Sequence, residues 1–93
     1  MPLIEFDSAK SAENARKRGI GFERFADMDF NTAISVEDTR KDYGEQRFRV
    51  LGLIDNQLHA AVITPRGDKI RVISLRRANR REERAYAKER ESS

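Results

Sequence analysis

The chain has 93 residues, which is enough for one domain with one modest hydrophobic core. Apolar and charged residues each make up 38% of it, so the core is expected to be small, with room for a partner protein to add stability. The absence of cysteine excludes disulfides, thiolate metal sites and cysteine nucleophiles. No apolar run approaches the roughly 20 residues of a membrane span, and the start lacks a signal-peptide pattern, so a cytoplasmic protein is expected.

Charge is distributed unevenly along the chain. Residues 1–45 hold 7 basic and 10 acidic side chains, a net of −3, whereas residues 46–93 hold 12 basic and 6 acidic ones, a net of +6. Arginine, which grips phosphate through two nitrogens at once, heavily outnumbers lysine. The second half therefore predicts a polyanionic partner. The alternative is a solvated surface with ion pairs along helices, which is favoured for the last helix taken alone.

The first elements are a strand and a helix. Residues 2–6 predict a short strand at a sheet edge, where an early proline is tolerated. Asp7 is a candidate N-cap for a helix over residues 8–18, and Gly19 is placed to end that helix in the left-handed conformation. The buried stripe of this helix is expected to be thin, and its members would be Ala9, Ala12, Ala15 and the aliphatic stem of Arg16.

A second short helix is expected to start near Gly21, with Ile20 and Phe25 in the positions of a hydrophobic staple. Its core-facing residues would be Phe22, Phe25, Ala26 and Met28. Residues 32–37 are rich in β-branched side chains and predict a strand. The charged residues 38–45 predict a loop.

Three apolar-rich runs of strand length follow, at residues 47–54, 58–64 and 69–75, with turn residues between them. This spacing predicts an antiparallel meander. Strict alternation assigns two faces to each strand. In the first run Phe48, Val50, Gly52 and Ile54 oppose Arg47, Arg49, Leu51 and Leu53, and in the last run Ile70, Val72 and Ser74 oppose Arg71, Ile73 and Leu75. One face is expected to pack on helices, and the other, which mixes apolar and cationic side chains, is the candidate binding surface.

A closing helix is expected over residues 80–90. Asn79 and Glu82 have the spacing of a capping box. Few side chains are available to pack this helix, namely Ala78, Ala85 and Tyr86. Residues 91–93 are expected to fray. The prediction is one α+β domain over residues 1–93, with two N-terminal helices, a mainly antiparallel sheet and a C-terminal helix.

Several fragments, in order, resemble the BrnT family. The family's start is matched by Phe6, Asp7, Lys10 and Asn14, and its K-H-G-V-S-F-E segment by residues 17–23. Its central E-x-R…G is matched by Glu45, Arg47 and Gly52, and its R-I-I-S-A-R-x-A-T…E…Y by residues 71–79 with Glu82 and Tyr86. Three positions depart from the pattern: Arg18 replaces a histidine, Gly21 a serine and Asn79 a threonine.

The resemblance implies a RelE-like fold and a ribonuclease toxin that inhibits translation. It also implies a cognate BrnA-type antitoxin that neutralises the toxin in a heterotetramer. That complex would reach operator DNA only through the antitoxin.

Cleavage of RNA through its own 2′-OH requires a base, cations around the phosphorane and an acid for the leaving oxygen. His59 is the one histidine, so a two-histidine mechanism is excluded, and His59 itself is interpreted as structural. RelE-type toxins instead use clustered arginine and lysine. On that basis the catalytic candidates are Arg47, Arg71, Arg76 and Glu45, with Lys17, Arg18 and Arg66 for phosphate and Tyr86 for stacking or proton donation. No metal site or cofactor is predicted, so the expected activity is metal-independent endoribonuclease.

Alternatives remain open at this point. Glu45 would merely pair with Arg47, Tyr86 would be a packing residue, and Arg80, Arg81 and Arg84 would form a solvated helix face. A non-enzymatic nucleic-acid-binding module would use residues 76–84 against phosphates. A degenerate toxin, inactive through the change at Arg18, would act as an antitoxin-bound co-repressor.

Overall fold

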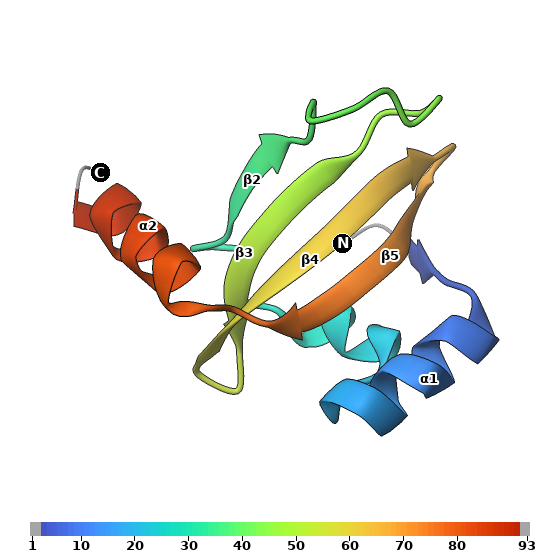
Figure 1. Cartoon of the computed structure of the whole chain (residues 1–93), viewed down its shortest axis with the longest axis horizontal. Helices are drawn as coiled ribbons and strands as arrows, with labels where there is room; N and C mark the ends of the chain where they lie inside the picture. Colours follow the sequence, from blue (N-terminus) through green and yellow to red (C-terminus); the bar gives the residue numbers. More distant parts are fainter. Residues whose placement is uncertain (1–2, 92–93) are drawn as a thin grey trace.

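The computed structural model describes residues 3–91, which form an α+β fold (Figure 1). The elements in chain order are β1 (Leu3–Glu5), α1 (Ser8–Arg18), the 3₁₀ helix η1 (Phe22–Asp27), β2 (Ile34–Glu37), β3 (Phe48–Ile54), β4 (Gln57–Arg66), β5 (Lys69–Arg77) and α2 (Arg80–Glu91). The predicted α+β class, mainly antiparallel sheet and closing helix are confirmed, and the second predicted helix is η1. Glu91, predicted to fray, ends α2, whereas the predictions for residues 2 and 92–93 lie outside the described residues.

The sheet has five strands in the order β1-β5-β4-β3-β2. The predicted meander is formed by β3, β4 and β5, which pair antiparallel in sequence, and β2 pairs antiparallel with β3. The edge strand β1 pairs parallel with β5. Asp55 and Asn56 join β3 to β4 with φ angles of 52° and 63°, the left-handed conformation of a tight two-residue hairpin.

One face of the sheet packs against α1 and η1, and this face holds the core (Figure 1). The predicted core residues Phe22, Phe25 and Met28 are buried there. The core cluster also contains Val50, Ile54, Ala61, Ile63, Val72 and Leu75. Gly52 lets Met28 pack directly against β3, because a Cβ at this position would overlap the side chain of Met28.

The predicted alanine stripe of α1 is wrong. Ala9, Ala12, Ala15 and Arg16 are all exposed, and the helix meets the rest of the protein through two polar side chains. Ser11 is buried, and its Oγ accepts a hydrogen bond from the Phe22 N–H at 2.8 Å. Asn14 donates to the Leu75 carbonyl oxygen at 2.7 Å and to that of Ile20 at 2.8 Å. Specific hydrogen bonds between side chains and backbone groups therefore position this helix in place of apolar burial.

Helix α2 is attached to the molecule by polar contacts. None of its residues is buried, and in Figure 1 it lies on the side of the sheet away from α1. The predicted capping box is confirmed, since Asn79 N donates to Glu82 Oε1 at 2.9 Å and Glu82 N to Asn79 Oδ1 at 2.8 Å. Among residues 3–91, no helix has the length and apolar character needed to cross a lipid bilayer.

Candidate nucleic-acid interface

A β-bulge decides which side chains share the second, outer face of the sheet. Along β4 and β5, Val62 pairs with Ser74 but Ile63 pairs with Val72, so Ile73 has no partner in the ladder. An extra residue reverses the alternation beyond it. Arg71 and Arg76, which an unbroken strand would place on opposite faces, therefore lie on the same face.

Strict alternation gave the wrong faces for the residues after this bulge. It grouped Ser74 with Ile70 and Val72, and Leu75 with Arg71. In the structure Leu75 is fully buried in the core, whereas Ser74 lines a groove on the outer face. The physical reason is the extra residue at Ile73, because alternation predicts faces only while every residue has a partner.

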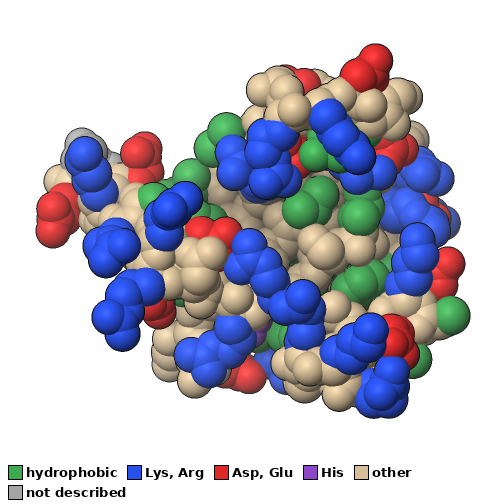
Figure 2. Space-filling view, viewed as in Figure 1, with side chains coloured by type: hydrophobic (Ala, Val, Ile, Leu, Met, Phe, Trp, Pro, Cys, Tyr) green, Lys and Arg blue, Asp and Glu red, His purple; other side chains and the backbone are tan. Residues whose placement is uncertain are grey.

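The groove on the outer face, which we call the sheet groove, has a volume of about 410 Å³ and runs between the sheet and α2. Its floor is aliphatic and includes Ile34, Val36, Leu51, Ala60 and Val62. Around this floor stand four arginines, Arg40, Arg49, Arg76 and Arg81. Figure 2 shows hydrophobic side chains exposed on this side of the molecule with lysine and arginine side chains around them. The predicted mixed apolar and cationic face is thus present.

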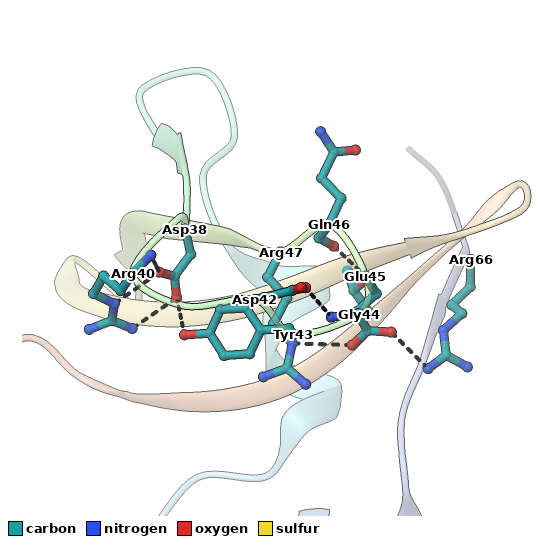
Figure 3. A network of polar contacts seen from close by, with 10 residues as sticks. Asp38, Arg40, Asp42, Tyr43, Gly44, Glu45, Gln46, Arg47 and Arg66 are labelled. Carbon is teal, nitrogen blue, oxygen red and sulfur yellow. Dashed lines mark hydrogen bonds and ion pairs between the residues drawn. The ribbon is translucent and has the colours of Figure 1, made fainter.

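At one end of the outer face, Glu45 lies between two arginines (Figure 3). Arg47 Nε donates to Glu45 Oε2 at 3.1 Å, and Arg66 Nη2 donates to Glu45 Oε1 at 3.4 Å. Within the described residues, the Nη atoms of Arg47 make no hydrogen bond or ion pair. The predicted candidates Glu45, Arg47 and Arg66 are therefore brought together, and Arg47 keeps donors available for an oxyanion.

Two residues that the sequence interpretation missed hold this end in place. The Tyr43 ring lies under the Arg47 guanidinium, 4.2 Å from ring centroid to Cζ, a favourable cation–π contact. The Tyr43 hydroxyl donates to Asp38 Oδ2 at 3.1 Å (Figure 3). Asp38 also accepts from Arg40 at 2.8 and 2.9 Å, and this pairing holds the pKa of the Asp38 carboxyl well below its ordinary value. The loop before β3 is thus an ordered polar network.

Arg71 lies at the same end of the face as this network. Arg71 on β5 pairs in the antiparallel ladder with Thr64 on β4. The Oγ1 of Thr64 donates to the carbonyl oxygen of Gln46 at 2.6 Å, and Gln46 directly precedes Arg47. Arg71 also lies close enough to Asp7 to contribute to the lowered pKa of that carboxyl, although the Lys10 N–H that Asp7 caps is the larger cause. Thr64 therefore separates two of the predicted cations, Arg47 and Arg71.

Arg76 stands at the other end of the outer face. Its Nη atoms donate to both carboxylate oxygens of Glu82, at 2.7 and 2.9 Å. This pair raises the pKa of Arg76 and lowers that of Glu82. Arg71 and Arg76 pair with residues of β4 that are four positions apart, which separates them by about 13 Å along the strand. Arg76 is thus on the same face as the Glu45 network but distant from it.

The other predicted residues are more scattered. Tyr86 donates to Thr32 Oγ1 at 3.1 Å, so its hydroxyl links α2 to the segment before β2. Lys17 and Arg18 are exposed at the end of α1, in the layer that covers the core face, and Lys17 pairs with Glu13 at 3.1 Å. They do not join the outer-face cluster. His59 is buried with Nδ1 2.8 Å from the Gln57 carbonyl oxygen, which supports its structural interpretation.

The fold and the outer face define a small α+β protein whose free sheet surface is suited to a polyanion. Over residues 6–82 the chain matches the family model described as the ribonuclease toxin, BrnT, of type II toxin-antitoxin system. The chain therefore belongs to the BrnT family of ribonuclease toxins, as the sequence fragments predicted. Type II systems pair a toxin with a protein antitoxin, so membership implies such a partner. Comparisons with curated proteins and with solved structures gave no match.

Proposed function

We propose that this protein is a metal-independent endoribonuclease that cleaves RNA on the outer face of its sheet and thereby inhibits translation. The observation that carries the proposal is the bulge at Ile73, which puts Arg71 and Arg76 on one face with Arg47. Guanidinium groups fixed on one surface supply the charge that a pentacoordinate phosphorane needs, without reorganisation during the reaction. No set of three or more carboxylate or imidazole groups placed to bind a metal ion occurs within residues 3–91.

The chemistry is assigned to the end of the face that holds Glu45. Glu45 is the proposed base for the 2′-OH, because it is the carboxylate held between Arg47 and Arg66. The free Nη donors of Arg47, with Arg71 across Thr64, would hold the scissile phosphate. Protonation of the leaving 5′-oxygen would come from water, because a guanidinium keeps its protons at neutral pH.

The remaining predicted residues take supporting roles in this proposal. Arg76 lies about 13 Å from Arg71 along the strand and would bind a neighbouring phosphate. To do so, its guanidinium would leave the Glu82 carboxylate and pair with the phosphate. Tyr86 would stack on a base, and Lys17 and Arg18 would contact more distant phosphates. Under the same proposal the fold is RelE-like, and a BrnA-type antitoxin neutralises the protein in a heterotetramer that contacts operator DNA through the antitoxin.

The test compares substitutions of outer-face arginines with one substitution on the opposite face of β5. Arg47→Glu and Arg71→Glu should abolish growth arrest and RNA cleavage, and circular dichroism should show an unchanged fold. Arg77→Glu is the matched control. Arg77 is exposed at the end of β5, and it pairs with the buried His59, so it lies on the opposite side of the sheet from Arg71. Full toxicity in both outer-face variants would overturn the site assignment, and an absolute Mg²⁺ requirement would contradict the mechanism.

A second candidate is a nucleic-acid-binding protein or co-repressor without cleavage. The observation that favours it is that both Nη atoms of Arg76 are paired with Glu82, while Arg18 stands where the family pattern has histidine. Purified free of its partner, such a protein would bind RNA with a steep salt dependence and leave it intact.

A further inference from the structure

The sheet groove has features that nucleic-acid binding leaves unexplained. Its floor is built from aliphatic side chains of β2, β3 and β4, and Val36 is 52% exposed at its edge. Single-stranded nucleic acids bind mainly by stacking bases on aromatic side chains, and no aromatic residue lines this groove among the described residues. An aliphatic floor instead fits the leucine, isoleucine or valine side chains of a protein segment.

Two of the four arginines in the groove, Arg49 and Arg81, form no ion pair within the described residues, whereas Arg40 pairs with Asp38 and Arg76 with Glu82. The pair with Arg76 is the main cause of the lowered pKa of Glu82, and Arg49 lies close enough to add to it. Arg49 stands on β3, where it pairs with Val36 and Val62 and so lies within the apolar floor, and Arg81 borders the floor from α2. A ligand of the groove is therefore expected to carry one carboxylate that meets a cation within the apolar strip and another at the edge of the strip beside α2.

Helix α2 shows the kind of segment that this chemistry accepts. It lines the groove with Glu82, Ala85 and Glu89, which recur at the spacing of one helix face. Of these, Glu82 forms the bidentate pair with Arg76. The face of α2 that borders the groove thus presents an acidic, an apolar and an acidic side chain in turn. It leaves most of the apolar floor uncovered, and Arg49 and Arg81 form no ion pair within the described residues.

We propose that the sheet groove is the docking site of the antitoxin and takes an acidic amphipathic segment of it, laid on the floor beside α2. Apolar side chains of the segment contact Ile34, Val36 and Leu51, and its carboxylates pair with Arg49 and Arg81. This inference deepens the proposed function and rests on it for the identity of the partner. A segment in this place also covers Arg76, so that neutralisation follows from occupation of part of the RNA surface.

The apolar contact is tested with Val36→Asp and its matched control Leu3→Asp. Both side chains are large, apolar and exposed, at 52% and 66%, but they lie at opposite edges of the sheet. The ligand is the purified cognate antitoxin, and its Kd is measured by calorimetry. Val36→Asp should weaken binding about tenfold or more, whereas Leu3→Asp should stay within about twofold of wild type.

The charged contact is tested with the double variant Arg49→Glu/Arg81→Glu against Lys10→Glu/Arg16→Glu. The two doubles change net charge equally, and Lys10 and Arg16 are exposed on α1, in the opposite layer. The groove double should weaken antitoxin binding about a hundredfold and the control much less. Circular dichroism and melting curves confirm that each variant is folded.

Wild-type affinity in the groove variants, equal loss in the controls, or no binding by the wild type would each overturn the proposal. It is also overturned if the groove variants lose affinity for a single-stranded RNA but keep the antitoxin, because the groove would then be an RNA surface. If the wild type fails to cleave RNA while the binding pattern holds, the docking site stands and the proposed function falls.

Discussion

Glu82→Ala should loosen α2 without unfolding the protein. The helix has no buried residue, and Glu82 serves two of its attachments, the bidentate pair with Arg76 and half of the capping box, while Tyr86 supplies another through Thr32. An isolated helix of 12 residues is marginal in water, so α2 depends on these contacts. The core lies on the other face of the sheet and does not include α2.

The size of the effect follows from the two lost contacts. The lost half of the capping box is worth about 0.5 kcal/mol. A bidentate pair that is partly exposed to solvent contributes about 1 kcal/mol. Together they amount to about 1.5 kcal/mol of local stability, which is roughly a tenfold change in the opening equilibrium of the helix.

Amide hydrogen exchange measures this opening directly. The α2 amides of Glu82→Ala should exchange about tenfold faster than those of the wild type, while β3, β4 and β5 keep their protection. Glu82→Gln is the informative companion, since it retains an acceptor for the cap but loses the charge, and it should lie between the two. Unchanged protection in α2, or a uniform loss over the whole sheet, would refute the reasoning.

Three further outcomes are expected. Asn14→Ala removes the hydrogen bonds to the Leu75 and Ile20 carbonyl oxygens. The loss should lower the free energy of unfolding by about 2 kcal/mol and the Tm by roughly 10 °C. A Tm shift below about one degree would contradict the role of Asn14 in docking α1. Gly52→Ala should destabilise by about 1 to 2 kcal/mol in denaturant titration, because the new methyl group overlaps the Met28 side chain, and a stability equal to wild type would show that the methionine moves freely. Arg76 is the main cause of the lowered pKa of Glu82. The ionised Glu82 therefore stabilises the attachment of α2 at pH values above its ordinary pKa of 4.5, and this stabilisation is lost as the pH falls through the lower pKa of the folded protein. The α2 carbon chemical shifts should therefore move toward coil in acid, and Glu82→Gln should remove this pH dependence.

Periodicity predicted the elements because most of them obey simple local rules. The strands of the meander alternate, Asp7 and Asn79 cap helices, and Gly19 ends α1 at a φ of 77°. The bulge at Ile73 was not predicted, although the run carries a signal of it. Val72 and Ile73 are adjacent apolar residues, and after them the apolar position shifts to Leu75 with polar neighbours on both sides. The extra residue at Ile73 decides whether Arg71 and Arg76 share a face.

The polar network before β3 was also not predicted. Residues 38–45 predicted a charged loop, and the loop does lack helix and strand. Its order comes from Asp38, which is buried and accepts from Arg40 and Tyr43, two and five residues further along the chain, and no simple spacing rule predicts this pairing. The one usable signal was the aromatic Tyr43 among charged residues, since a ring beside arginine favours a cation–π contact.

The most direct test of the central claim is cleavage of a single-stranded RNA by the purified, antitoxin-free protein in excess EDTA, alongside its 2′-O-methyl counterpart. Arginine-based catalysis through the RNA's own 2′-OH predicts that the RNA is cut to products with cyclic phosphate ends, that the methylated strand stays intact, and that Arg47→Glu/Arg71→Glu cuts neither. Cleavage of the methylated strand, or undiminished cleavage by the double variant, would contradict it.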